Sequence, residues 1–186
     1  MIKKLSADYL LTIEGNPIKE GVLLMDDEEI IDITGRDQHD AGSVEIHKGV
    51  LLPGFVNAHC HLELSHMKGK VNTGTGLIPF ISDVVTFRDI PQEEILQAIK
   101  DADEEMQSEG IVAVGDISNK ADTVNQKSIS PIRYYTFVEM FDFLQDNWAE
   151  QEYNKYFEVY EAHESNHKNK KSAVPHAPYT LSLIHM

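Results

Sequence analysis

Two histidines separated by one residue, His59 and His61, are the side chains whose types and spacing best suit chemistry. Side chains alternate along a β-strand, so these two are expected on one face and Cys60 on the opposite face. Two imidazoles on one face can share a metal ion. A pair of hydrogen-bonded structural histidines is the alternative, and the position at the end of an apolar strand favours metal binding.

The segment before the pair predicts that strand. Its apolar residues suit a fully buried strand of a parallel sheet that is covered on both faces. In a parallel α/β barrel, the carboxyl end of such a strand is where chemistry takes place. The residues that carry this prediction are Val50, Leu51, Leu52, Phe55 and Val56.

The rest of the chain alternates between predicted helices and strands, as in an α/β protein. Helices are predicted over 77–87, 91–109 and 147–165, buried strands over 111–117 and 132–139, and a further strand with its rim loop over 172–180. The helix over 91–109 carries one apolar stripe for the core, formed by Ile95, Ile99, Ala102 and Met106. Before residue 50, short strands and turns predict a small antiparallel sheet with an exposed edge.

Two carboxylates end predicted strands at the same rim as the histidines. For Asp116, hydrogen bonding that caps a loop is favoured over a role in the site. For Glu139, a substrate contact and a structural ion pair are both open.

Three segments carry a resemblance to a known family. Residues 53–61, Pro-Gly-Phe-Val-Asn-Ala-His-Cys-His, resemble the first-strand signature of the amidohydrolase superfamily of metal-dependent (β/α)8-barrel hydrolases. Residues 62–65, Leu-Glu-Leu-Ser, and 175–180, Pro-His-Ala-Pro-Tyr-Thr, are similar to the branch that deaminates aminated purines and related heterocycles. That branch includes adenosylhomocysteine and aminodeoxyfutalosine deaminases.

The resemblance implies an α/β fold with a partial (β/α)8 TIM barrel. Residues 1–52 would form the N-terminal part of a β-sandwich, and residues 53–186 the first four βα units of the barrel. A whole barrel of this type takes ~250 residues, about twice what this second segment offers. The chain is therefore expected to be a truncated form, a cleavage product or an incomplete sequence of a longer protein.

The resemblance also implies the roles of the site residues. His59 and His61 would bind a divalent metal, with zinc expected and iron or nickel as alternatives. Glu63, Glu139 and His176 would bind substrate. A loop salt bridge stays open for Glu63, and direct metal ligation or loop packing stays open for His176.

The implied reaction is hydrolytic deamination of an aminopurine nucleoside-type substrate by a metal-bound hydroxide. The family's remaining metal ligands, on the fifth and eighth strands, and its acid/base residues, after the fifth strand and on the sixth, would lie beyond Met186. No catalytic residue is therefore assigned within the chain, which is expected to be inactive alone. The alternatives are an amidohydrolase acting on another C–N or C–Cl bond, and a non-catalytic half-barrel.

Composition narrows the expected partners. The chain has 31 acidic and 16 basic residues and a formal net charge of −15, so nucleic acid and anionic membranes are not expected partners. A small-molecule substrate is expected, as is a homo-oligomer formed through exposed sheet edges. Cys60 is the one cysteine, so no disulfide forms within the chain and a cytoplasmic location is expected.

Overall fold

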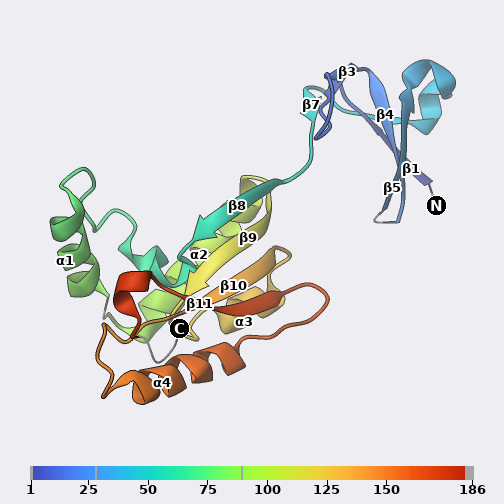
Figure 1. Cartoon of the computed structure of the whole chain (residues 1–186). Coiled ribbons are helices and arrows are strands. Elements are labelled where there is room, and N and C mark those ends of the chain that lie inside the picture. Colours follow the sequence, from blue (N-terminus) through green and yellow to red (C-terminus); the bar gives the residue numbers. More distant parts are fainter. Residues whose placement is uncertain (1, 28, 89, 183–186) are drawn as a thin grey trace. The chain divides into compact units, whose positions relative to one another are not determined.

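The computed structural model describes residues 2–27, 29–88 and 90–182. The chain divides into two compact units, Met1–Gly54 and Phe55–Met186 (Figure 1). The predicted domain boundary, after residue 52, lies next to this division. None of the helices in the described ranges is long and apolar enough to cross a lipid bilayer.

The N-terminal unit consists of short strands in two sheets, with the orders β5-β4-β1-β6 and β3-β2-β7. The hairpin pairs are antiparallel as predicted, but β6 and β7 add in parallel to β1 and β2, because later segments return to the first strands. Leu10 and Val22 are fully buried in this unit, whereas Ile30 and Ile31 on the edge strand β5 are exposed. The strands are β1 (Ile2–Ser6), β2 (Tyr9–Leu10), β3 (Ile18–Lys19), β4 (Gly21–Asp26), β5 (Glu29–Gly35), β6 (Glu45–Ile46) and β7 (Val50–Leu51).

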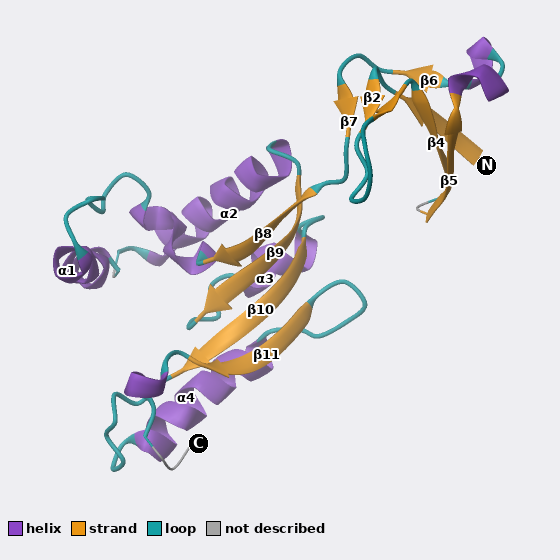
Figure 2. Ribbon diagram, turned by 45° about the horizontal axis from the view of Figure 1, so that its top comes forward, coloured by secondary structure: helices purple, strands orange, loops and turns teal. Residues whose placement is uncertain are grey.

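The C-terminal unit is a parallel α/β layer. Its four strands have the order β11-β10-β9-β8, and every neighbouring pair is parallel. Helices α2, α3 and α4 cover one face of this sheet (Figure 2). The elements are β8 (Phe55–Cys60), α1 (Leu77–Phe87), α2 (Gln92–Ser108), β9 (Ile111–Ser118), α3 (Val124–Ile129), β10 (Arg133–Met140), α4 (Ala149–Ala162) and β11 (Lys170–Pro175), with a 3-10 helix, η3 (Leu62–Met67), after β8.

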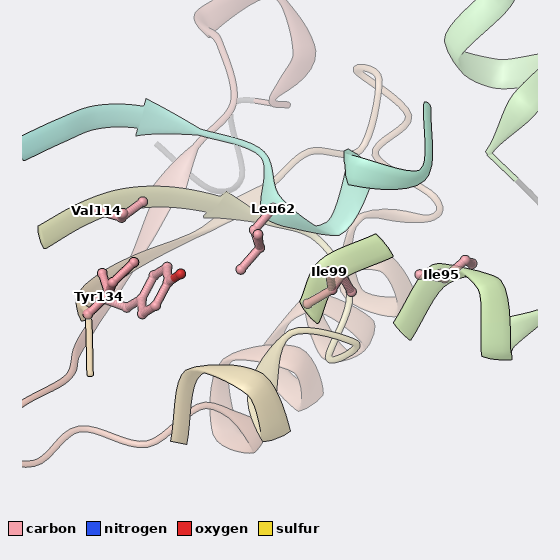
Figure 3. Close-up of a cluster of buried hydrophobic side chains, with 6 residues drawn as sticks. Leu62, Ile95, Ile99, Val114 and Tyr134 are labelled. Atoms are coloured by element: carbon pink, nitrogen blue, oxygen red, sulfur yellow. The ribbon is translucent and has the colours of Figure 1, made fainter. Parts of the chain in front are cut away.

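The core of this unit lies between the sheet and α2 (Figure 3). Ile95 and Ile99 of α2 are buried with Val114 of β9 and Tyr134 of β10, and Leu62 at the start of η3 belongs to the same cluster, as does Ile132. The predicted helical stripe is thus confirmed, with Ala102 and Met106 partly buried at its continuation. This packing holds η3, which directly follows the two histidines, against the helix layer.

The prediction of one fully buried strand before the histidines is wrong. Val50 and Leu51 belong to β7 in the N-terminal unit, while Phe55 and Val56 belong to β8 in the C-terminal unit. Phe55 and Val56 are more than half exposed. β8 is an edge strand of its sheet, and within the described residues no further layer covers the face opposite the helices, so apolar side chains there stay in solvent.

Strand β1 and helix α3 are among the short elements that have no counterpart among the predictions. Strand β1 pairs along its length with β4, and its sequence, Ile-Lys-Lys-Leu-Ser, shows no clear alternation. Helix α3 has six residues, too few for a recognisable apolar stripe. Lys127 is its buried residue.

Candidate metal and substrate site

The two histidines come together at the carboxyl end of β8. Their ring centroids are 5.2 Å apart and the planes meet edge to face at 67°. β8 is paired in parallel with β9, so this end of the strand is the rim at which parallel α/β proteins bind ligands. The rings therefore share one side of the strand, as the alternation of side chains predicts.

Cys60, between the histidines, has the opposite surroundings. Its side chain is partly buried and packs against the core cluster. Burial raises the pKa of the Cys60 thiol to about 12, and the nearby Asp116 carboxylate acts in the same direction. A neutral thiol in the core is neither a nucleophile nor a metal ligand.

The surroundings of His61 lower the pKa of its imidazole, which favours metal binding. Burial lowers the pKa of the His61 imidazole below its ordinary value, while the Glu139 carboxylate acts in the opposite direction. A lowered pKa means that the ring is neutral at pH 7, which is the form that donates a nitrogen lone pair to a cation. His176 and His59 contribute smaller effects that also lower this pKa.

Glu139 and His176 form a pair at the same rim. Glu139 lies near the end of β10 and His176 follows β11 directly, and His176 Nδ1 is 3.0 Å from Glu139 Oε2. The His176 side chain is 43% exposed and the Glu139 side chain 13%, so the imidazole is the part of the pair that a ligand can reach. Glu139 therefore pairs with His176, and a substrate contact of Glu139 stays a prediction.

Glu63 lies in a different environment. It is buried, and its Oε2 accepts hydrogen bonds from the backbone N–H groups of Asn119 and Lys120, both at 2.8 Å. Its Oε1 pairs with Arg88 at 3.2 Å. Burial raises the pKa of the Glu63 carboxyl, and these donors oppose the rise. The loop salt bridge left open by the sequence is thus present, while a substrate contact stays a prediction.

Asp116 caps a loop, as the sequence favoured. Its Oδ1 accepts a hydrogen bond from Leu62 N at 2.8 Å, and its Oδ2 lies 2.6 Å from Lys127 Nζ. Lys127 was not among the predicted functional residues. A single lysine in a polar segment gives no sequence signal, because only folding of α3 onto the sheet removes it from solvent.

The donor set determines how well a metal fits. Imidazole ligands suit zinc, iron or nickel, and His59 and His61 supply two of them. A catalytic zinc usually takes ~three protein ligands. Within residues 2–27, 29–88 and 90–182, no group of three or more His, Cys, Asp or Glu side chains is placed to hold an ion. The described residues thus fit one part of a metal site.

The sequence was compared with protein families and with individual known proteins. No protein-family profile matches the sequence. A 90-residue stretch, 48% of the chain, is 33% identical to adenosine deaminase of Helicobacter pylori and covers 22% of that protein. This chain therefore spans only a small part of the sequence relative that it matches.

Solved structures match nearly the whole chain. The aminofutalosine deaminase of Helicobacter pylori, in complex with methylthio-coformycin, has a TM-score of 0.78 at 22% identity over 96% of this chain and 45% of that one. An adenosine deaminase of Xanthomonas campestris with bound zinc has a TM-score of 0.70 at 18% identity, over 95% of this chain and 43% of that one. The chain spans less than half the length of these enzymes, which it resembles in fold, and part of its sequence is similar to an adenosine deaminase.

Proposed function

We propose that the protein is a metal-dependent deaminase that hydrolyses an aminopurine nucleoside-type substrate. In this proposal, residues 1–52 are the N-terminal part of a β-sandwich, and residues 53–186 are the first four βα units of a (β/α)8 barrel. The likeness to deaminases that are more than twice as long supports both parts of the proposal. In this proposal, the rest of the barrel would supply the further metal ligands and the acid/base group.

One observation carries the proposal. Two adjacent imidazoles and a Glu139–His176 pair gather at the carboxyl ends of parallel strands β8, β10 and β11. Histidines at the end of one strand bind a cation, and a carboxylate–imidazole pair two strands away can hold a polar heterocycle beside it. The His59–His61 pair is therefore assigned to the metal and the Glu139–His176 pair to the substrate.

In the proposed site, His59 and His61 hold a divalent cation through neutral ring nitrogens. When bound, such a cation lowers the pKa of water from ~16 to about 7 and so supplies hydroxide at neutral pH. His176, oriented through Nδ1 by Glu139, presents Nε2 to the substrate. Glu63 contacts the substrate only if its loop opens, since its oxygens are taken up by Arg88 and backbone N–H groups.

Metal binding is the first test. Titration calorimetry with Zn²⁺ is expected to detect binding that His59→Ala and His61→Ala each abolish. His167→Ala is the matched control, because His167 lies exposed in the polar loop before β11. Zn²⁺ binding that survives both site variants would refute the assignment of the histidine pair.

Activity is the second test, and it needs the product of the longest reading frame that contains this sequence. Ammonia release is expected from adenine nucleosides and is expected to be lost in His61→Asn. His176→Asn is expected to raise KM more than it lowers kcat, because it alters substrate binding. Release from amides or chlorinated triazines, with none from adenine nucleosides, would replace the proposed substrate class.

A further inference from the structure

One residue, Asp116, contacts the chain on both sides of His61. It accepts a hydrogen bond from Leu62 N at 2.8 Å, and its carboxylate is near enough to the Cys60 thiol to raise the pKa of that thiol. Asp116 and Cys60 are also paired across strands β8 and β9. Asp116 therefore contacts both neighbours of His61, Cys60 through the strand pairing and Leu62 through its fully buried carboxylate.

The strand needs such a fixed point. The pairing of β8 with β9 loses its regular register between Asn57 and Cys60, so the backbone around His59 lacks a continuous ladder. β8 is also an edge strand, with no described strand on its other side. An irregular edge leaves the direction of the two imidazoles to contacts outside the ladder.

Lys127 fixes the carboxylate in turn. Its Nζ lies 2.6 Å from Asp116 Oδ2 and donates to Thr136 Oγ1 at 2.9 Å, and it stands 5.5 Å from the centre of the Tyr134 ring. The Lys127 side chain is 4% exposed and that of Asp116 is 0%. Rotation of the carboxylate would therefore break a buried ion pair.

We propose that Asp116, held by Lys127, is a positioning residue that aims the His59 and His61 imidazoles at one cation. It acts through the backbone at 60–62 and does not touch the ligand. The role rests on the proposed function only in that the histidine pair binds the metal.

A second buried carboxylate provides a matched control. Asp103 of α2 is also fully buried, and it accepts hydrogen bonds from Tyr134 and Ser130 on one oxygen and from Gln107 and Gln126 on the other. None of these four donors belongs to β8 or η3. Loss of Asp103 therefore disturbs the same core without releasing the histidine segment.

The test is the Zn²⁺ affinity of folded variants, measured by titration calorimetry. The His59→Ala variant shows how much Zn²⁺ binding comes from histidines outside the pair. The double variant Asp116→Ala/Lys127→Met leaves no lone buried charge, so it is expected to fold. Its Zn²⁺ affinity is expected to fall by roughly 10- to 100-fold, as for other groups that orient metal ligands. Asp116→Asn/Lys127→Met keeps an acceptor for Leu62 N and is expected to regain most of the affinity. Asp103→Asn is expected to be less stable with unchanged affinity.

The other outcomes overturn either the positioning role of Asp116 or the metal site itself. Unchanged affinity in Asp116→Ala/Lys127→Met, or an equal loss in Asp103→Asn, overturns the positioning role alone. Zn²⁺ binding that is the same in the unaltered protein and in His59→Ala overturns the metal site together with this role. If the double variant does not fold, amide hydrogen exchange in the unaltered protein decides: slow exchange at Leu62 supports the role, and exchange as fast as in an exposed loop overturns it.

Discussion

The histidines of the C-terminal unit show how surroundings change one side chain. His59 is exposed, His61 is partly buried beside it, and His163 is buried just after α4. Burial lowers the pKa of His163 to about 4, with the nearby Lys127 ammonium acting in the same direction. The same residue type therefore serves as a candidate ligand at the rim and as a buried neutral group after α4.

His163 predicts a specific loss of stability in mild acid. Its pKa is lower in the folded chain than the ordinary 6.5, so the unfolded chain binds more protons between pH 6.5 and about 4. The stability contributed by the neutral ring is complete above pH 6.5 and is lost as the pH falls toward 4. Between pH 7 and pH 5, His163 should account for at most about 2 kcal/mol of lost unfolding free energy.

Urea unfolding of the unaltered protein and of His163→Gln at both pH values measures this loss. The stability of His163→Gln should fall less over this range. His167→Gln removes an exposed histidine from the neighbouring loop and should behave like the unaltered protein. An equal pH dependence in His163→Gln and the unaltered protein would contradict the buried neutral ring.

At the scale of elements, the contact between β8 and β9 depends on a residue without a side chain. A Cβ added at Gly115 would lie 2.7 Å from Ala58 O, closer than real Cβ atoms approach. The contacted atom is the backbone carbonyl oxygen of Ala58, next to His59, so the strain cannot be relieved by rotating a side chain. The strands themselves would have to separate where the histidine pair begins.

Gly115→Ala should therefore lower both stability and Zn²⁺ affinity. Overpacking of this kind costs about 1–3 kcal/mol of unfolding free energy. Gly42→Ala is the control, because a Cβ there meets nothing within 4 Å. Urea unfolding and calorimetry measure the two effects, and a Gly115→Ala protein with full affinity for Zn²⁺ would show that the spacing of β8 and β9 does not set the site.

Helices α1 and α2 contribute to stability in different ways. No residue of α1 is buried, although Leu77, Ile78 and Val85 are apolar, whereas Ile99 of α2 is fully buried. Ile78→Glu should therefore change the unfolding free energy by no more than about 0.5 kcal/mol. Ile99→Ala should cost about 2–5 kcal/mol. Urea unfolding followed by far-UV circular dichroism measures both, and a large cost for Ile78→Glu would show that α1 packs against the core.

At the scale of the whole molecule, net charge and open sheet edges have opposite effects on self-association. The charge of −15 repels copies of the chain, and the edge of β8, which no described strand pairs, offers backbone groups for pairing. Salt shortens the Debye length from about 10 Å at 0.1 M to about 3 Å at 1 M. Association should therefore increase with salt concentration.

Sedimentation velocity in low and high NaCl tests the predicted homo-oligomer. Val56→Lys adds a charge to the edge strand β8 and should reduce association. Val112→Lys is the control, because Val112 is similarly exposed but lies on β9, which is paired on both sides. Equal behaviour of the two variants would exclude the edge of β8 as the contact.

The sequence alone predicted the parts of this protein that depend on local pattern. The alternation around Cys60 predicted that His59 and His61 share one side of a strand, and the stripe from Ile95 to Met106 predicted the buried side of α2. Both follow from the geometry of a single element, and neighbouring elements need not be known. The parallel order of the later strands followed from the alternation of strands and helices.

Only the tertiary structure decided how distant residues combine. Val50 and Val56 lie in different sheets, and Glu139 pairs with His176. Glu63 pairs with Arg88 and accepts hydrogen bonds from a loop backbone. The tertiary structure also brought Lys127 to Asp116 behind the histidine pair. These contacts join segments far apart in the chain, and their existence depends on sheet register and burial, which no single stretch of sequence contains.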